Sequence, residues 1–285
     1  MQIPRCLLYC FIASCAYAQE SLDPSSPYLS GNYQIYYCTT YSVHISQLLQ
    51  SIWHTIAEAL EHLEAMGPEG TPLYNSFFHK ADPNKIKGVL SRIAAGDNIA
   101  FQGSLQPPLI ICDDPSVPAV ARSWGHAACQ HDPLAHALWG EGTHAVFLCQ
   151  NYLRNKRVIP SEKQCVGWNR LSTGWLLGET QWTVLFHELV HLYLGVPNLV
   201  PEIRGIFEVQ DLDSEDAVRN PPSYGFFLAN MKAGCKKFRP KASLRAHGRK
   251  LSDNSTFDVD LIAQDHLIRN ETARNCGDLC LWGVS

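Results

Sequence analysis

The segment 180–194 constrains the fold most, because its pattern predicts a helix that is hydrophobic on nearly every face. A helix that is apolar all round is buried in the core. This helix also contains the sequence His187-Glu188-Leu189-Val190-His191, so three polar side chains enter the core with it. Burying polar groups without partners costs several kcal/mol, so these three need a reason to be there. The apolar residues around them are Trp182, Val184, Leu185, Phe186, Leu189, Val190, Leu192 and Leu194.

The spacing of the two histidines indicates a metal ion. Side chains at positions i and i+4 of a helix lie one above the other, so both imidazoles can reach the same ion. Glu188 directly follows His187, where its carboxylate can accept a proton from a metal-bound water. Zinc lowers the pKa of such a water to about 7. The alternative is a pair of core histidines satisfied by ordinary hydrogen bonds; we favour zinc, with one ion per chain.

A catalytic zinc ion normally has three protein ligands and one open position, so a third ligand is needed. A histidine six residues after His191 is excluded, because Pro197 stands there, and the next histidine is His247. A carboxylate must therefore serve. We favour Glu202, since the turn at Gly195 and Pro197 can bring it back under the helix. The other candidates are Glu208, which ranks second, Asp211 and Asp213.

Hydrophobic spacing and turn residues predict an α+β fold that is mostly helical, with a small sheet. Four segments combine helical spacing with residues typical of helix starts or ends. Two short apolar runs flanked by turn residues predict strands. We expect the region between these strands, which contains glycines and histidines, to be a loop. The predicted helices cover residues 40–66, Asp82 onward, 180–194 and Ser223 to Gly234, and the predicted strands cover 109–111 and 145–148.

Four histidines lie in this predicted loop. Together they could form an accessory metal site. Their spacings of five, five and eight residues match no compact ligand set, so we expect ordinary loop histidines instead. They are His126, His131, His136 and His144.

The first eighteen residues predict a secretory signal peptide. Arg5 supplies a positive charge, residues 6–13 are apolar, and Ala16-Tyr17-Ala18 has the small-x-small pattern of a cleavage site. No later stretch approaches the ~20 continuous apolar residues of a membrane-spanning helix. We therefore expect a secreted, extracellular protein with no membrane partner.

Cysteine usage agrees with export. Of 11 cysteines, three lie in the predicted signal peptide, which leaves eight for up to four disulfides. A zinc ribbon is the rival interpretation, but the chain has no Cys-x-x-Cys pair. Asn254 and Asn270 begin N-glycosylation sequences, as expected of an exported protein. The eight cysteines are Cys38, Cys112, Cys129, Cys149, Cys165, Cys235, Cys276 and Cys280.

Charge and composition divide the rest of the chain. The 23 basic and 27 acidic residues give a net charge of −4, which argues against a nucleic-acid-binding domain. Residues 236–250 are basic and the segment after them is acidic, so we expect 236–285 to be a poorly packed extension. A single domain at 19–235 precedes it. We expect the basic run to be a solvated segment, with a processing site or a patch for anionic polysaccharide as alternatives.

Several of these features together resemble the deuterolysin-like (aspzincin) zinc metallopeptidases. The shared features are the histidine-bearing helix, a carboxylate after a Pro/Gly turn, and the segment from Ser223 to Asn230 followed by Cys235. Within that superfamily, the cysteine layout is most similar to a group of secreted fungal allergens and pH-regulated antigens. The resemblance covers about residues 38–235, and the histidine-bearing helix is its one individually specific motif.

The resemblance implies a zincin-like metallopeptidase domain. In it, His187 and His191 would be zinc ligands and Glu188 the general base, with Glu202 near the place of the family's third-ligand aspartate. Arg204 stands where the family has a tyrosine that is thought to stabilise the oxyanion. We assign Arg204 that catalytic role, because an arginine can supply it electrostatically.

The sequence therefore predicts a secreted zinc-dependent metalloendopeptidase that hydrolyses peptide bonds by Glu188-assisted attack of a zinc-bound water. We expect a monomer that acts on protein or peptide substrates and has no nucleic-acid partner. Pro222 replaces the acidic residue of the lysine-specific members, so the resemblance implies no lysine specificity. Two alternatives stay open: a zinc-binding or zinc-scavenging protein without turnover, and a host-interaction protein that uses the fold as a scaffold.

Overall fold

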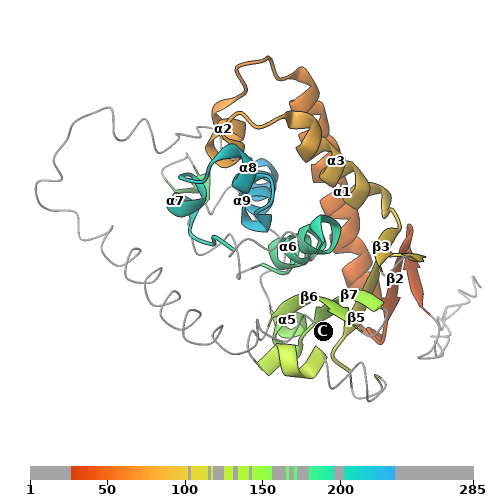
Figure 1. Ribbon diagram of the computed structural model, residues 1–285. Helices are drawn as coiled ribbons and strands as arrows, with labels where there is room; N and C mark the ends of the chain where they lie inside the picture. The colour runs from red at the N-terminus through yellow and green to blue at the C-terminus, as the bar shows by residue number, and fades with distance from the viewer. Residues whose placement is uncertain are drawn as a thin grey trace, which may run out of the picture.

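The computed structural model describes residues 27–101, 104–114, 117, 125–130, 134–140, 143–155, 165–166, 170–171, 180–195 and 202–234. Within these residues, a small mixed sheet has most of the helices packed against one face, which confirms the predicted α+β, mostly helical class (Figure 1). The predicted signal peptide at 1–18, the extension at 236–285 and both glycosylation sequences lie outside the described residues.

The main sheet has five strands in the order β1-β2-β5-β7-β6. Its three central strands, β2, β5 and β7, run parallel, and each edge strand pairs antiparallel with its neighbour. The edge strand β6 lies beside α6. The strands are β1 Tyr28–Ser30, β2 Tyr33–Tyr36, β5 Leu109–Cys112, β6 Ala135–Gly140 and β7 Thr143–Leu148, with separate pairs of β3 Ile99–Phe101 with β4 Ser104–Gln106 and of β8 Cys165–Val166 with β9 Arg170–Leu171.

Local sequence signals account for several helix ends. The side chains of Thr71, Asp82 and Thr180 each accept a backbone hydrogen bond at the start of a helix. Gly96 and Gly234 end helices in the left-handed conformation that glycine adopts readily. The helices are α1 Ser42–Ala65, α2 Pro72–Phe78, α3 Pro83–Ala95, α5 Gln150–Arg154, α6 Gln181–Leu194, α7 Ile206–Val209, α8 Ser214–Ala217 and α9 Pro221–Ala233, and residues 125–130 are also helical.

The position of α6 explains its composition. Alternate residues of a strand point to opposite faces of a sheet. Ile110 and Val146 accordingly join the main core beneath the helices, whereas Ile111 and Phe147 join a smaller cluster on the other face. Helix α6 lies over β6 and β7 and contacts α1, α3 and α9 as well (Figure 1). It is therefore enclosed, which is why nearly all of its faces are apolar.

All four predicted helices and both predicted strands are present, with two corrections. The fourth helix begins at Pro221 rather than Ser223, because prolines fit the first turn, where a backbone N–H needs no partner inside the helix. The predicted loop before 145–148 is not all loop, since it contains β6 and the helical residues 125–130. Gly140, which suggested a loop, instead ends β6 where it pairs with β7.

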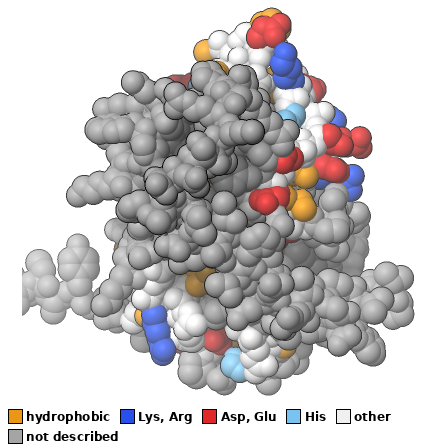
Figure 2. Space-filling view, turned by 90° about the vertical axis from the view of Figure 1, so that its left-hand side faces the viewer, with side chains coloured by type: hydrophobic (Ala, Val, Ile, Leu, Met, Phe, Trp, Pro, Cys, Tyr) orange, Lys and Arg blue, Asp and Glu red, His pale blue; other side chains and the backbone are white. Residues whose placement is uncertain are grey.

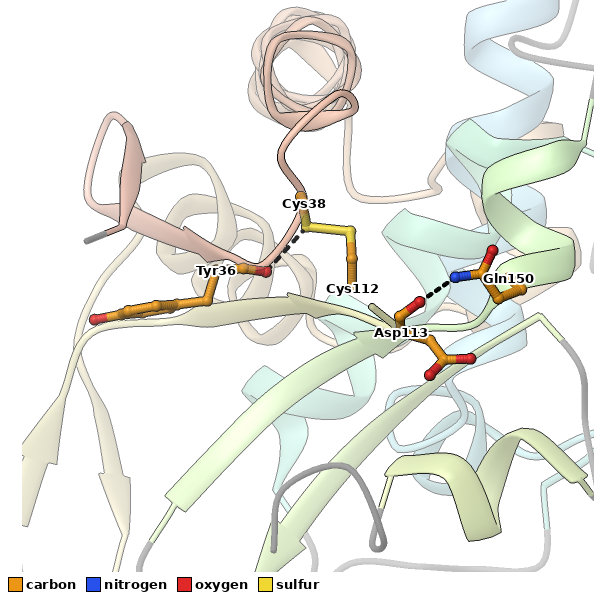
Figure 3. Close-up of a disulfide and its surroundings, with 5 residues drawn as sticks. All are labelled: Tyr36, Cys38, Cys112, Asp113 and Gln150. Carbon is orange, nitrogen blue, oxygen red and sulfur yellow. Dashed lines mark hydrogen bonds between the residues drawn. A yellow bond between two sulfur atoms is a disulfide. The ribbon is translucent and has the colours of Figure 1, made fainter. Parts of the chain in front are cut away.

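Two disulfides join described cysteines, Cys38 with Cys112 and Cys129 with Cys149. The first links the chain just before α1 to the last residue of β5, so it fastens the sheet to the longest helix (Figure 3). The prediction of a disulfide framework is confirmed for these two bonds. The structure does not describe the side chains of the remaining cysteines of the predicted mature chain, Cys165, Cys235, Cys276 and Cys280.

Replacing Cys38 and Cys112 together by alanine should lower the free energy of unfolding by about 4 kcal/mol. The bond spans a sequence separation of 74 residues, so it removes much chain entropy from the unfolded state. Nearby, Gln150 still donates to the carbonyl of Asp113 and keeps α5 at the end of β5 (Figure 3). Urea unfolding of the variant and the wild type measures the difference.

The shorter disulfide provides the control for that experiment. Cys129 and Cys149 are separated by 20 residues, so their removal should cost less, about 3 kcal/mol. If removing the Cys129–Cys149 bond lowered the free energy of unfolding more than removing the Cys38–Cys112 bond, the explanation from chain entropy in the unfolded state would be wrong.

The described surface mixes charges and carries few large apolar side chains. Figure 2 shows acidic and basic side chains interspersed on the described part of one face. Leu29, Val43 and Leu105 are the exposed large hydrophobic residues of the described ranges. None of the helices in those ranges combines the length and hydrophobicity that crossing a membrane requires.

Candidate metal centre

Helix α6 carries the two predicted metal-binding histidines into the core. The helix begins after Thr180, whose side chain accepts a hydrogen bond from the N–H of Thr183. It ends at Gly195, whose φ of 82° favours glycine, and the N–H of Gly195 donates to the carbonyl of His191. His187 is 6% exposed, so its imidazole is buried as the sequence predicted.

The imidazoles of His187 and His191 converge on one small volume. Their Nε2 atoms lie 3.1 Å apart. The ring centroids are 4.7 Å apart and the ring planes meet at 77°, so the rings are close to perpendicular. The residues share a face because one helical turn separates them.

Glu202 joins the two histidines from the segment that precedes α7. Its Oε1 lies 3.0 Å from Nε2 of His187, and its Oε2 lies 3.5 Å from Nε2 of His191. Each of the three residues offers a ligand atom, and these atoms all lie within 4.8 Å of one another. Across the described ranges, no other histidines, cysteines and carboxylates form such a group of three or more.

The spacing of these donor atoms suits a small tetrahedral ion. Zinc bonds of ~2.0–2.1 Å at tetrahedral angles place neighbouring ligand atoms about 3.3 Å apart. The two imidazole Nε2 atoms lie 3.1 Å apart. Oε1 of Glu202 lies 3.0 Å from the Nε2 of His187, and Oε2 of Glu202 lies 3.5 Å from the Nε2 of His191. Within the described part of the chain, the buried Oε1 of Glu202 has no aligned hydrogen-bond donor, and a buried charged oxygen needs a partner. Two imidazoles with one carboxylate can hold a catalytic zinc and leave a fourth position for water.

Electrostatics keep Glu202 ionised. Burial raises the pKa of Glu202, but the charge of His187, the close approach of both imidazoles and the charge of Arg204 lower it by more, so this pKa lies well below its usual range. Burial is the largest single effect on the pKa of His187 and lowers it, but the charge and close contact of Glu202 together with the charge of Glu188 raise it by more, so the net shift is upward. A metal ion and a proton compete for the same imidazole nitrogen, so metal binding at this group depends on pH.

Glu188 faces the edge strand of the sheet. Its Oε2 accepts a hydrogen bond of 2.6 Å from the backbone N–H of Ala137 in β6. Although Glu188 directly follows His187, its carboxylate is not part of the converging ligand group. Because Ala137 holds one carboxylate oxygen, the carboxylate has a fixed orientation, and the second oxygen can still accept a proton.

Arg204 contacts the carboxylate of Glu202. Its Nη2 lies 3.1 Å from Oε2 of Glu202, and the Arg204 side chain is 45% exposed against 17% for Glu202. The guanidinium therefore lies at the solvent side of the group. Its predicted role at the oxyanion stays a prediction, and the contact with Glu202 is an additional role that the sequence did not suggest.

The alternative third ligands lie elsewhere. Glu208 lies on α7 and folds back over Gly205, where a side chain at position 205 would collide with its carboxylate. Asp213 caps α8 by accepting a hydrogen bond from the N–H of Asp216. Asp211 is exposed. Of the four carboxylates considered, Glu202 is the one that the structure brings to the histidines.

The histidines of the predicted loop are separated in the fold. His126 is exposed on the helical segment, His136 pairs across the sheet with Phe147, and His144 is buried in β7. Burial lowers the pKa of His144, and a backbone hydrogen bond at Pro107 opposes that shift only in part. The metal-ligand group of the described residues includes none of these three, and His131 lies outside those residues.

The sequence did not predict the roles of two residues beside the site, Ala137 and Asn220. Ala137 acts through its backbone N–H, which no side-chain motif reveals. The side chain of Asn220 accepts a hydrogen bond from the N–H of Ile203 at 3.1 Å and donates one to its carbonyl at 3.2 Å. In the sequence, Asn220 directly precedes a proline, and this pattern predicts the start of a helix. It does not predict a contact with Ile203, the residue next to Glu202.

No model of a known protein family matches the chain, and no curated protein matches it. The function is therefore inferred from the chemistry of the site and from the sequence motifs that form it.

Proposed function

We propose that this protein is a secreted zinc-dependent endopeptidase with a zincin-like domain, in which His187, His191 and Glu202 hold the metal. The observation that carries the proposal is the convergence of two imidazoles and one carboxylate, with ligand atoms within 4.8 Å of one another, beside a separately held carboxylate, Glu188. The disulfides support an oxidising compartment, as expected of an exported protein.

The side chains around this group suit hydrolysis of a peptide bond. A bound zinc ion supplies a Lewis acid and a water of pKa about 7. Glu188 accepts the proton of the attacking water and returns it to the leaving amine, while the N–H of Ala137 keeps its carboxylate oriented. Arg204, beside Glu202, contributes positive charge where the oxyanion develops.

The edge of the sheet supports a peptide as the substrate. Among the described strands, β6 pairs with β7 alone, and the N–H of Ala137 points away from β7 toward Glu188. An extended peptide can add to such an edge through main-chain hydrogen bonds. That position would bring a substrate carbonyl close to Glu188 and the histidines.

A zinc-scavenging protein could use the same three ligands. The position of Glu188 favours the enzyme, because a storage site needs no carboxylate held in a fixed orientation beside its ligands. The two functions make different forecasts for turnover, so a direct assay separates them.

The purified full chain should contain one zinc ion and should hydrolyse casein at neutral pH. A chelator such as 1,10-phenanthroline should abolish hydrolysis, and added zinc should restore it, because the ion is part of the active site. Elemental analysis and a casein assay on the same preparation test both statements. Zinc without hydrolysis would favour the scavenger, and no metal after gentle purification at neutral pH would contradict the proposal.

A further inference from the structure

We infer that Asn220 is a positioning residue that sets the third metal ligand, an inference that rests on the proposed zinc site. The segment of Glu202, Ile203 and Arg204 belongs to no helix or strand. A ligand on such a segment needs outside support, because metal sites require their ligands to be held to within about 0.5 Å. The side chain of Asn220 provides that support.

The amide of Asn220 holds both polar groups of one backbone residue. Its Oδ1 accepts a hydrogen bond from the N–H of Ile203 at 3.1 Å, and its Nδ2 donates to the carbonyl of Ile203 at 3.2 Å. An antiparallel strand makes the same pair of bonds to its neighbour, so the amide replaces a strand partner. Ile203 is bonded directly to Glu202, so this contact fixes the backbone from which the ligand extends.

The sequence of α9 makes the Asn220 side chain available for this contact. An asparagine at the N-cap normally accepts a hydrogen bond from the second or third helical residue. Here the first two helical residues are Pro221 and Pro222, which have no N–H, and the N–H of Ser223 donates to the backbone carbonyl of Asn220 at 2.9 Å. The Asn220 side chain therefore makes no capping hydrogen bond.

Asn220 is itself well fixed. It is 5% exposed, and its Nδ2 also donates to Oγ of the fully buried Ser223 at 3.1 Å. Helix α9, which begins directly after Asn220, packs against α6. Helix α6 therefore carries the two histidines, and the residue that supports Glu202 lies at the start of α9, which packs against α6.

Asn220→Asp is the primary test, because it keeps the size and the acceptor for Ile203 but loses the donor. The full-length variant should bind zinc about 10- to 100-fold more weakly than the wild type, as is typical when a residue that orients a ligand is changed. Asn220→Ala removes both bonds and should weaken binding at least as much. Competition with a chromophoric chelator gives each Kd, and circular dichroism checks that each variant is folded.

Asn230 provides a matched control on the same helix. It is 3% exposed, donates to the carbonyl of Phe226, and lies ten residues further along α9, about 15 Å away. Asn230→Ala should leave the zinc Kd within about twofold of the wild-type value, even if urea unfolding shows a less stable metal-free protein. A general loosening of α9 would instead weaken zinc binding in both variants.

A double variant separates a positioning role from a merely structural one. If Asn220 acts through Glu202, Asn220→Asp should change the zinc Kd little once Glu202→Gln is present, because the two effects are then not additive. Two outcomes would overturn this inference without affecting the proposed function. One is a wild-type zinc Kd in Asn220→Asp, and the other is an approximately tenfold loss of affinity on adding Asn220→Asp to the Glu202→Gln variant. A loss in Asn230→Ala equal to that in Asn220→Asp would also overturn it. A wild-type chain that binds no zinc would overturn the proposed function and this inference together.

Discussion

The Glu188→Gln protein should bind zinc as tightly as the wild type but cleave casein about 10²- to 10⁴-fold more slowly, the usual effect of removing a general base. Glutamine has the same length, and its carbonyl oxygen can still accept the hydrogen bond from Ala137. It cannot accept the proton that the attacking water loses. Since Glu188 is outside the ligand group, the metal affinity should not change. Zinc content and casein hydrolysis of one preparation measure both quantities.

Glu208→Gln is the matched control for this change. Glu208 lies on α7, close in sequence to the third ligand but outside the ligand group, so the variant should keep both zinc and activity. If Glu188→Gln cleaves casein as fast as the wild type, a contaminant or another site does the cutting and the mechanism is wrong. The scavenger hypothesis predicts that neither variant changes any activity, because there is none to lose.

The sequence predicted α6 well because two independent patterns coincide in it. Its hydrophobic residues require burial on all sides, and the structure encloses it between the sheet and other helices. The spacing of His187 and His191 then fixes their shared face, whatever surrounds the helix. Both conclusions depend only on local geometry, so they need no knowledge of the rest of the fold.

The edge strand β6 shows where local patterns are insufficient. Its six residues include histidine and glycine, and its four hydrophobic residues do not alternate with polar ones, so the pattern does not distinguish a strand from a loop. What makes it a strand is pairing with β7, for example Ala137 with Val146, and a chain pattern does not show which segments pair. The contact between Ala137 and Glu188 depends on that pairing, so it could not be predicted either.

The third ligand illustrates the same limit more sharply. Glu202 and Glu208 both follow α6 in the chain, and the sequence alone allows either carboxylate to return to the histidines. The choice depends on long-range contacts, among which we infer a role for the two hydrogen bonds between Asn220 and Ile203. A sequence motif ranks such candidates, but the tertiary contacts select among them.

Glu202→Gln should weaken zinc binding more than any other change considered, by more than the 10- to 100-fold that is typical of residues beside a ligand. The amide loses the negative charge that balances the cation, in a side chain only 17% exposed. With free zinc at 1,000 times the wild-type Kd, binding stabilises the wild type by ~4.1 kcal/mol, and a Kd that is 100-fold weaker reduces this to ~1.4 kcal/mol. The rise in Tm on adding zinc should therefore be much smaller in the variant. Comparing each protein with and without zinc removes any effect on the metal-free fold.

Glu208→Gln and Asp213→Asn complete that experiment, because they remove carboxylates of the same region that serve other roles. Glu208 folds over Gly205 and Asp213 caps α8, so both variants should keep the full zinc-dependent rise in Tm. If Glu208→Gln alone abolished the rise while Glu202→Gln kept it, Glu208 on α7 would be the third ligand in place of Glu202. Asn220 would then support a residue that is not a ligand, and the fold would have to bring α7, rather than the segment before it, to the histidines.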